Sequence, residues 1–288
     1  MPPSTLPIAF ATYTARPGGE PDDLLAVEAV EARGAPVVRV PWDVLDPADY
    51  RAIVLRSTWD YFHRLSDFLA WIGRVEASGV PMFNGADTVR GNVDKRYLRA
   101  LEAAGVPVVP TAWPTPGDRL AYVLAAHSWA DAVVKPAVSG GAFETFRVAA
   151  GDAAGVEDRF AALLARGTVL VQPFLPEIET DGEFSFLFID GAFSHAVLKR
   201  PRAGDFRVQA HLGGTTVPFA ASDALVGEAA AVLRAAGGAG LLYARIDGLV
   251  RGGRFELMEA ELTEPAMFFE QDAASPARFA DALLARLG

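Results

Sequence analysis

Three acidic side chains near the C-terminal end, those of Asp247, Glu259 and Glu261, could gather on one face of a β-hairpin. Two apolar runs flank residues 251–254, a glycine-containing stretch typical of a hairpin loop. Side chains alternate between the two faces of a strand, so Arg245 shares a face with Asp247, and Glu259 shares one with Glu261. The spacing therefore predicts carboxylates that could meet on one sheet face.

The length of the hairpin loop decides whether these carboxylates meet. A three-residue loop centred on glycine 253 places Asp247 opposite Glu259. It also places Arg245 opposite Glu261. A two-residue turn instead opposes Asp247 to Met258 and separates the cluster. Converging anions repel one another unless a cation lies among them, and Mg²⁺ is the hard ion that oxygen ligands favour. The alternative is a solvent-exposed charged face, and the hairpin alone does not decide between the two.

Two lysines lie where an anionic ligand could meet backbone N–H groups. Lys135 ends an apolar run and precedes the loop Val138-Ser139-Gly140-Gly141, whose backbone can approach a phosphate closely. Lys95 follows Asp94, which could cap a helix, and helix N-termini attract anions. Taken alone, each lysine is more often an ordinary solvated residue.

A basic cluster, Lys199-Arg200-Pro201-Arg202 with Arg207, interrupts an acidic sequence. The 288 residues carry a formal net charge of −10, from 36 acidic and 26 basic side chains. The cluster therefore indicates a specific anion pocket, and the following Gly213-Gly214 could form a mobile turn. A nucleic-acid duplex or an anionic membrane would be a poor partner for the acidic surface as a whole.

The composition limits the class of protein. With 51% hydrophobic and 22% charged residues it is globular, and the length allows about two domains. The absence of cysteine excludes disulfides, thiolate nucleophiles and cysteine zinc sites, and permits a reducing compartment. No signal-like segment or long apolar run is apparent, so we expect a soluble, cytoplasmic protein with no nucleic-acid or membrane partner.

Residues 1–91 alternate strand and helix signals, which predicts a domain built as a small parallel α/β unit. The expected strands are residues 7–12, 37–40 and 53–55, and the expected helices are residues 22–33 and 65–77. Ligands on such sheets bind beyond the carboxyl ends of the strands. The segment Arg56-Ser57-Thr58-Trp59-Asp60-Tyr61 follows the third strand and is therefore expected at that edge.

Residues 92–288 form the second predicted domain, in which hairpins predominate and the main sheet should be largely antiparallel. The expected strands are residues 106–109, 132–135, 145–148, 169–172, 183–189, 192–199, 242–250 and 255–262. The expected helices are residues 92–104, 120–126, 156–166, 224–236 and 279–287. This mixture of elements belongs to the α/β (α+β) class.

The order of these landmarks resembles the ATP-grasp superfamily of carboxylate–amine ligases, which includes D-alanine–D-alanine ligase, glutathione synthetase and the ribosomal-protein glutamate ligases. The matching segments are Asp94-Lys95, Val134-Lys135-Pro136, residues 172–183, Gly204-Asp205-Phe206-Arg207 with Gly213-Gly214, Arg245-Ile246-Asp247 and Met258-Glu259-Ala260-Glu261. The resemblance implies an ATP-grasp fold with a parallel N-terminal subdomain, a lid over about residues 108–170 and a mainly antiparallel C-terminal sheet.

The resemblance also implies roles for single residues. The implied ATP-binding residues are Lys95 and Lys135 for the phosphates, Ser139-Gly140-Gly141 as a flexible cover, Gln172-Pro173-Phe174-Leu175 as the hinge that reads adenine, Glu183 for the ribose, and Lys199. The implied ligands of two Mg²⁺ ions, or of Mn²⁺ in their place, are Asp247, Glu259 and Glu261. The implied catalytic residues are Arg207 and Arg245, which would steady the transferred phosphoryl group. Many relatives carry asparagine where this chain has Glu261, and both side chains offer an oxygen ligand.

The segment Ser57-Thr58-Trp59-Asp60-Tyr61 resembles a motif of the ATP-grasp branch that includes the cycloserine-forming cyclo-ligase. The implied substrate contacts are Arg56, Ser57, Thr58, Trp59, Asp60, Arg207, Gly213 and Gly214. The alternative is a packed aromatic loop at the domain junction.

We therefore expect an ATP- and Mg²⁺-dependent ligase that joins a small amino-acid-like acid to an amine through an acyl-phosphate. Because an acyl-phosphate hydrolyses in open water, a lid must close over it. The alternatives are an intramolecular cyclo-ligase, a non-catalytic ATP-binding protein, and phosphoryl transfer to a hydroxyl group. Related ligases are often dimers or tetramers, so a homodimer or homotetramer is a further expectation.

Overall fold

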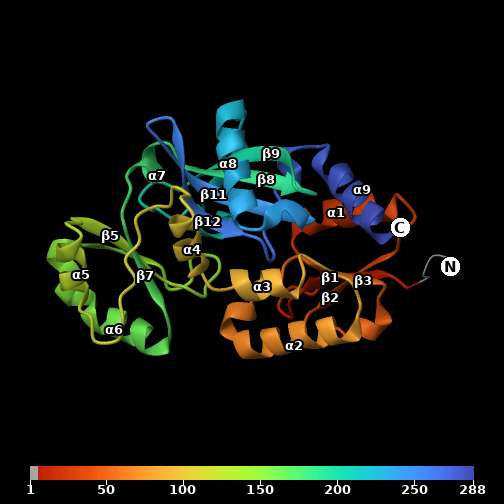
Figure 1. The fold of residues 1–288 in the computed structure, drawn as a ribbon, viewed down its shortest axis with the longest axis horizontal. Coiled ribbons are helices and arrows are strands. Elements are labelled where there is room, and N and C mark those ends of the chain that lie inside the picture. Colours follow the sequence, from red (N-terminus) through yellow and green to blue (C-terminus); the bar gives the residue numbers. More distant parts are fainter. Residues whose placement is uncertain (1–5) are drawn as a thin grey trace.

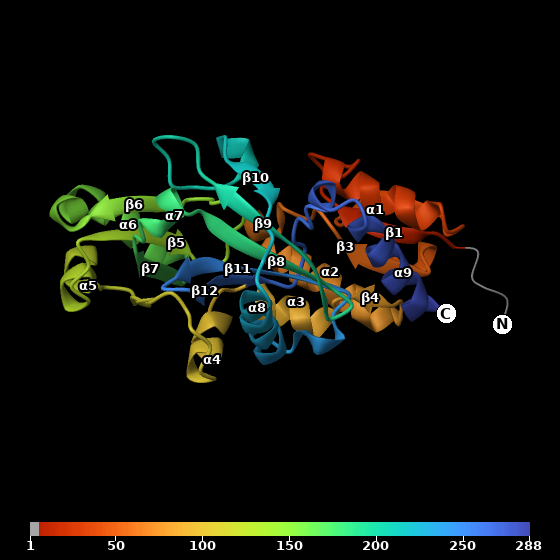
Figure 2. The same ribbon diagram turned by 90° about the horizontal axis from the view of Figure 1, so that it is seen from above.

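Three β-sheets follow one another along the long axis of the molecule. The computed structural model describes residues 6–288, with a parallel sheet at one end, the largest sheet in the middle and a small sheet at the other end (Figure 1). The view from above shows the same order, with the C-terminal end beside the parallel sheet (Figure 2). None of the helices within residues 6–288 has the length and apolar character needed to cross a membrane.

The first unit is a parallel sheet, as expected. It has four strands in the order β2-β1-β3-β4, one more than the three expected. Its strands are β1 (Ile8–Thr12), β2 (Val37–Pro41), β3 (Ala52–Leu55) and β4 (Met82–Phe83), and its helices are α1 (Pro21–Glu31), α2 (Leu65–Ser78) and α3 (Ala86–Asn92). One face packs on α2 and α3. The other packs on α1 and on α9 (Ser275–Leu287), which comes from the far end of the sequence (Figure 1).

The small sheet is antiparallel and has the order β6-β5-β7. Its strands are β5 (Asp131–Pro136), β6 (Phe146–Ala149) and β7 (Val169–Pro173), and α5 (Leu120–Ala126) and α6 (Glu157–Arg166) cover one face. Ala132 and Val134 point into the apolar core under these helices. Because side chains alternate along a strand, Val133 and Lys135 lie on the open face.

Two linking segments differ from the expected regular structure. The strand expected over residues 106–109 is wrong, because the segment forms only an isolated bridge between Val108 and Leu257. Pro107 and Pro110 lack the N–H groups that a longer ladder would need. The helix expected over residues 92–104 is interrupted, since α3 ends at residue 92 and α4 (Tyr97–Ala103) begins only after an intervening turn.

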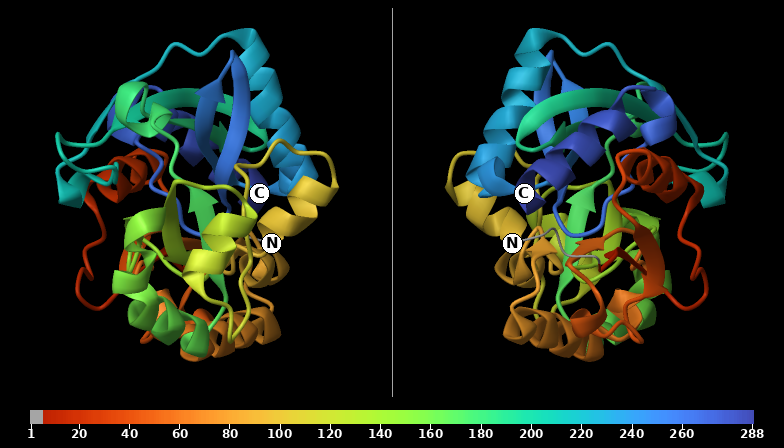
Figure 3. Two further views of the ribbon diagram at one scale, coloured as in Figure 1. Left: turned by 90° about the vertical axis from the view of Figure 1, so that its left-hand side faces the viewer. Right: turned by 90° about the vertical axis from the view of Figure 1, so that its right-hand side faces the viewer.

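The largest sheet is antiparallel, in the order β10-β9-β8-β11-β12. Its strands are β8 (Glu183–Ile189), β9 (Ala192–Arg200), β10 (Thr215–Pro218), β11 (Tyr243–Arg251) and β12 (Arg254–Glu261), with α7 (Glu177–Thr180) and α8 (Asp223–Ala235) beside them. An apolar cluster joins one face to α8 and α4, and Figure 3 shows α8 lying along the sheet. The opposite face carries Glu183, Lys199, Arg245 and Asp247.

Of the two loop lengths that the sequence allows, the structure has the two-residue turn between β11 and β12. Arg251 pairs with Arg254 across the turn. The two residues between them, Gly252 and Gly253, have φ angles of 57° and 79°. Tight hairpin turns of this kind require positive φ at both positions, which glycine adopts without strain.

A β-bulge restores the register that this turn alone would break. The pairing shifts between Asp247 and Gly248, so that Asp247 lies opposite Glu259 rather than Met258. The pairs beyond the shift are Arg245 with Glu261 and Ile246 with Ala260. The charged residues therefore pair as they would with a three-residue loop, although the turn has two residues.

Gly248 is the position at which a side chain would disturb this bulge. An added Cβ would lie 2.2 Å from the carbonyl oxygen of Glu256 and 2.6 Å from the ring of Phe255. We expect Gly248→Ala to lower the free energy of unfolding by roughly 1–3 kcal/mol, because the backbone must shift. The measurement is urea unfolding, with Gly227→Ala on α8 as the control. Nothing lies within 4 Å of the control position, so that variant should not be destabilised, and equal midpoints for both variants would contradict the prediction.

Candidate active site

Asp247 is the centre of a buried ion network on the face of β11. It is 2% exposed, and its carboxylate accepts hydrogen bonds from Arg245 Nε at 3.0 Å and from Ser185 Oγ at 2.6 Å. The Nζ atom of Lys199 lies 3.5 Å away. Burial alone would raise the pKa of Asp247, but the charges of Arg245 and Lys199 outweigh it and lower the pKa. Asp247 is therefore an ionised group with two protein cations beside it.

The network continues into the neighbouring strands. Lys199 forms an ion pair with Glu183, the residue opposite it on β8. Arg245 forms an ion pair with Glu261 and donates to the carbonyl oxygen of Ala266 at 3.0 Å. Burial outweighs the charge of Arg245 and raises the pKa of Glu261 to about 7. The cations among these carboxylates are thus supplied by the protein itself.

Lys95 connects β12 to the loop that follows β5. Its Nζ atom lies 3.0 Å from Glu259 Oε1 and donates to the carbonyl oxygen of Ser139 at 2.8 Å. The expected helix cap is wrong, because Asp94 accepts the N–H of Arg96 within a turn and α4 begins only after that residue. These tertiary contacts hold Lys95 between two helices rather than at the start of one.

Lys135 lies on the open face of the small sheet without an acidic partner. Its ammonium group forms no ion pair or hydrogen bond within residues 6–288. Burial lowers its pKa, although the nearby charge of Glu259 acts in the opposite direction. A desolvated cation without a counter-ion can bind an anion without first breaking an internal ion pair.

The small-residue loop after β5 contacts two other parts of the molecule. A Cβ on Gly140 would lie 3.2 Å from the ring of Phe62, which belongs to the first unit. A Cβ on Gly141 would lie 3.3 Å from the ring of His211, in the segment after β9. Together with the contact from Lys95 to Ser139, these approaches place the loop where the three sheets meet.

The expected adenine hinge, Gln172-Pro173-Phe174-Leu175, begins as the buried end of β7 and continues past it. Pro173 has no N–H, and the N–H of Phe174 donates to the carbonyl oxygen of Asp131 at 2.9 Å. Within residues 6–288 the N–H of Leu175 has no acceptor. The N–H of Leu175 is therefore the backbone donor of this hinge that is free to bind a ligand.

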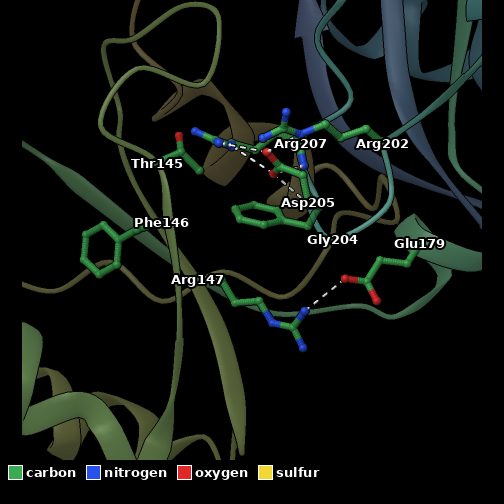
Figure 4. A pocket seen from close by; sticks show the side chains of 9 residues that line it. Thr145, Phe146, Arg147, Glu179, Arg202, Gly204, Asp205 and Arg207 are labelled. Atoms are coloured by element: carbon green, nitrogen blue, oxygen red, sulfur yellow. Dashed lines mark hydrogen bonds and ion pairs between the residues drawn. The ribbon is translucent and has the colours of Figure 1, made fainter. Parts of the chain in front are cut away.

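Arg207 lies apart from the ion network, in an open cavity beside the small sheet (Figure 4). It donates to Asp205 at 2.8 Å through Nη2 and at 3.0 Å through Nε, and it does not contact Arg245. The cavity holds about 460 Å³ and is lined by Thr145, Phe146, Arg147, Glu179, Arg202, Gly204, Asp205, Phe206 and Arg207. The turn Gly213-Gly214 ends the segment that carries Arg207, and Gly214 packs against the backbone of Val208.

Arg56 is buried, Asp60 is half-buried, and both are engaged by other protein groups. Arg56 is 1% exposed, and its Nε donates to Asp23 at 3.0 Å while its guanidinium lies 5.4 Å from the ring centre of Tyr243. Asp60 accepts a hydrogen bond from Trp42 Nε1 at 2.7 Å. For these two residues the contacts favour the packed-loop alternative.

The residues between them have polar groups without protein partners. Ser57 and Thr58 are 0% exposed, and within residues 6–288 neither hydroxyl group has a hydrogen-bond partner. Trp59 donates from Nε1 to the backbone carbonyl of Glu264 at 3.1 Å. The loop after β3 therefore meets the segment after β12, as its place at the sheet edge predicts.

Glu264 is a residue of this region that the sequence patterns do not identify. It lies three positions after Glu261, so it falls outside the alternation of β12, and its nearness to the acidic hairpin is the one signal that points to it. Burial and the charge of Glu261 raise its pKa to about 8. Ser185 and Phe268 are further additions: the first donates to Asp247, and the ring of the second lies 5.4 Å from the guanidinium of Arg245.

Family comparison agrees with this arrangement of residues. Residues 116–274 match the ATP-grasp domain of prokaryotic glutathione synthetase, and residues 8–84 match the N-terminal domain of D-cycloserine synthetase DcsG. The chain belongs to the ATP-grasp ligases. It is therefore an enzyme that uses ATP to form carbon–nitrogen bonds.

Individual relatives cover nearly the whole chain. Cycloserine biosynthesis protein DcsG of Streptomyces lavendulae is 35% identical over 283 residues, which span 91% of this chain and 92% of that protein. Glutathione synthetase of Prochlorococcus marinus (strain MIT 9313) is 30% identical, over 93% of this chain and 86% of that one. The crystal structure of D-cycloserine synthetase DcsG has a TM-score of 0.86 at 30% identity, covering 98% and 99% of the two chains. D-alanine–D-alanine ligase from Bacillus anthracis shares the fold, with a TM-score of 0.69 at 14% identity over 98% and 97%.

Proposed function

We propose that this ATP-grasp ligase activates a carboxyl group of a small amino-acid-like substrate as an acyl-phosphate and closes a ring within the same molecule. The observation that supports this most is the gathering of four cations around the carboxylates of β11 and β12. These cations are Lys95, Lys135, Lys199 and Arg245. Such a set can neutralise a triphosphate and align it with an anionic nucleophile.

Lys135 is the proposed main contact to the ATP phosphates, because its ammonium group has no partner in the protein. The loop Ser139-Gly140-Gly141 would cover them, and Lys95 already holds the first residue of that loop. The N–H of Leu175 would bind the adenine edge. Glu183, from the buried end of β8, would hold the ribose hydroxyls, with Lys199 beside it.

The carboxylates of β12 suit Mg²⁺. No group of three or more acidic or histidine side chains within residues 6–288 is arranged to enclose a metal ion, and Asp247 is shielded by its cations. The side chains of Glu259 and Glu261, however, are 28% and 29% exposed and lie on the same face. Mg²⁺ is usually bound by one or two carboxylates together with water and substrate phosphates, so this pair fits the ion. The bound ion would neutralise charge on the phosphates.

The proposed reaction has two steps. The carboxylate oxygen of the substrate forms a bond to the γ-phosphorus as the bond to ADP breaks. A nitrogen then attacks the acyl carbon, and inorganic phosphate leaves. Arg245, and Arg207 from the neighbouring cavity, would steady the transferred group. The loop after β5 would exclude water, because the acyl-phosphate would otherwise hydrolyse.

The N-terminal unit favours ring closure over the joining of two molecules. Residues 8–84 match the N-terminal domain of D-cycloserine synthetase, and this unit brings Ser57 and Thr58 to the segment after β12. Joining of an acid to a separate amine is the second candidate, which the match of residues 116–274 to glutathione synthetase favours. That second match covers the ATP site, which both reactions share.

Glu259→Gln should abolish metal-stimulated release of ADP, because the amide keeps the shape of the side chain but not its charge. The measurement is ADP release over a Mg²⁺ titration with an active substrate. Glu256→Gln is the matched control on the same strand, where Glu256 pairs with Arg251 near the turn. Wild-type turnover in Glu259→Gln would contradict the metal assignment.

Lys135→Ala should raise the ATP concentration for half-maximal turnover by roughly 10- to 100-fold, because a charge-assisted contact to phosphate is lost. The same loss should appear in direct ATP titrations by calorimetry. Arg74→Ala removes one positive charge from an exposed position on α2 and serves as the control. If Lys135→Ala binds ATP as tightly as the control does, the lysine is not part of the site.

Product mass distinguishes the two modes of bond formation. Amino acids and their derivatives are screened for stimulated ADP release, and the products are weighed by mass spectrometry. Ring closure should need one organic substrate and give a product lighter than it. A product heavier than either of two required substrates would show that the enzyme joins an acid to an amine.

A further inference from the structure

Glu264 is an acidic residue with no counter-charge of its own. It is half-buried, and within residues 6–288 its carboxylate forms no hydrogen bond or ion pair. The nearby cations are already engaged, since Lys95 pairs with Glu259, and Arg245 with Asp247 and Glu261. A partly desolvated carboxylate is costly until a proton or a cationic group compensates it.

Tyr61 supplies an independent sign of a ligand at the same place. It is 6% exposed and its ring stacks on Phe68 at 5.0 Å, but its hydroxyl group has no hydrogen-bond partner within residues 6–288. Burial raises the pKa of Tyr61, and the charges of Glu264 and Glu259 raise it further. The hydroxyl has no partner among the described residues, so its oxygen is free to accept a hydrogen bond from a ligand.

One hydrogen bond ties together the two segments that carry these residues. The indole N–H of Trp59 donates to the carbonyl oxygen of Glu264 at 3.1 Å, so the loop carrying Tyr61 is tied to the segment carrying Glu264. Two more hydroxyl groups of that loop, on Ser57 and Thr58, are buried without partners. Within the described part of the chain, the junction therefore combines one carboxyl group that has no cationic partner with polar groups that lack hydrogen-bond partners.

We propose that Glu264, assisted by the hydroxyl of Tyr61, binds the amino group of the substrate and makes the enzyme select for it. An ammonium group offers the positive charge that the carboxylate lacks and N–H donors for the hydroxyl oxygen. The inference rests on the proposed function, which brings an amino-acid-like molecule to the carboxylates of β12. The inference adds recognition of the amino group, which distinguishes an amino acid from a simple acid.

Two ring compounds that differ in one amino group test this proposal. D-cycloserine carries the amino group, and isoxazolidin-3-one is the same ring without it. Binding of each to the holoenzyme with ADP and Mg²⁺ is measured by calorimetry. We expect the wild type to bind D-cycloserine at least about tenfold more tightly, in line with a charge-assisted hydrogen bond. In Glu264→Gln this preference should disappear, and in Tyr61→Phe it should shrink.

The controls separate recognition of the amino group from other roles. Glu270→Gln changes an exposed glutamate six positions further along and should keep the wild-type preference. Glu264→Gln should also keep the wild-type affinity for ADP with Mg²⁺, because the inference gives Glu264 no part in metal binding. Loss of that affinity would make it a metal ligand and overturn the inference.

The remaining outcomes distinguish this inference from the proposed function. If the wild type binds both rings equally, or if Glu264→Gln keeps the full preference, the inference is wrong and ring closure is unaffected. If the wild type binds neither ring, a cycloserine-type reaction and the inference fall together. Isosteric Glu264→Gln removes a carboxyl group that has no partner within residues 6–288, and Tyr61→Phe removes only one oxygen atom, so the folded enzyme can be compared in each case.

Discussion

The attraction between Asp247 and its two cations, Arg245 and Lys199, is the interaction on which the rest of the site depends. It places charge on a sheet face that is otherwise closed to water, and each cation reaches a second carboxylate on a neighbouring strand. Removing one member of a buried ion pair typically costs about 3–5 kcal/mol, because the other is left without compensation. The network therefore fixes Glu183 on β8 and Glu261 on β12, the two strands that flank β11. A nucleotide would bind to charges whose positions are already set.

The bulge on β12 reconciles this charged face with the apolar face behind it. Phe255, Leu257 and Ala260 all pack toward α8, although strict alternation would send Ala260 to the other side. The extra residue falls at Met258, which joins a separate apolar cluster near the hinge. The alternation of side chains along β12 therefore shifts once, by one residue. Glu259 and Glu261 stay on the face of the ion network, and the apolar residues of β12 stay in the core. A regular hairpin with the same turn could satisfy only one of these two faces.

Hydrophobic periodicity and turn residues predict the parallel sheet, the antiparallel main sheet and most of the strands, because alternation and glycine turns are local signals. The pairing of Asp247 with Glu259 follows from the sequence only for a three-residue loop, whereas the protein reaches it through a bulge that nothing near Met258 signals. Lys95 shows the second limit: a cap signal at Asp94 is overridden by contacts to residues more than forty positions away. Arg56 shows the third. Its place after a strand predicts the sheet edge, whereas its partner Asp23, on a different helix, decides which way the side chain turns.

The packing of α9 against the first sheet has a consequence for how this protein is made. Phe279 and Leu283 lie in the same core as Ile8 and Phe10, so the opening residues of the chain find their final neighbours in a helix near its other end. During synthesis, the part of the first sheet that α9 covers stays exposed until residues 275–287 have left the ribosome. Such a face is a target for chaperones and for aggregation. Translation speed and chaperone supply thus become conditions for a working enzyme.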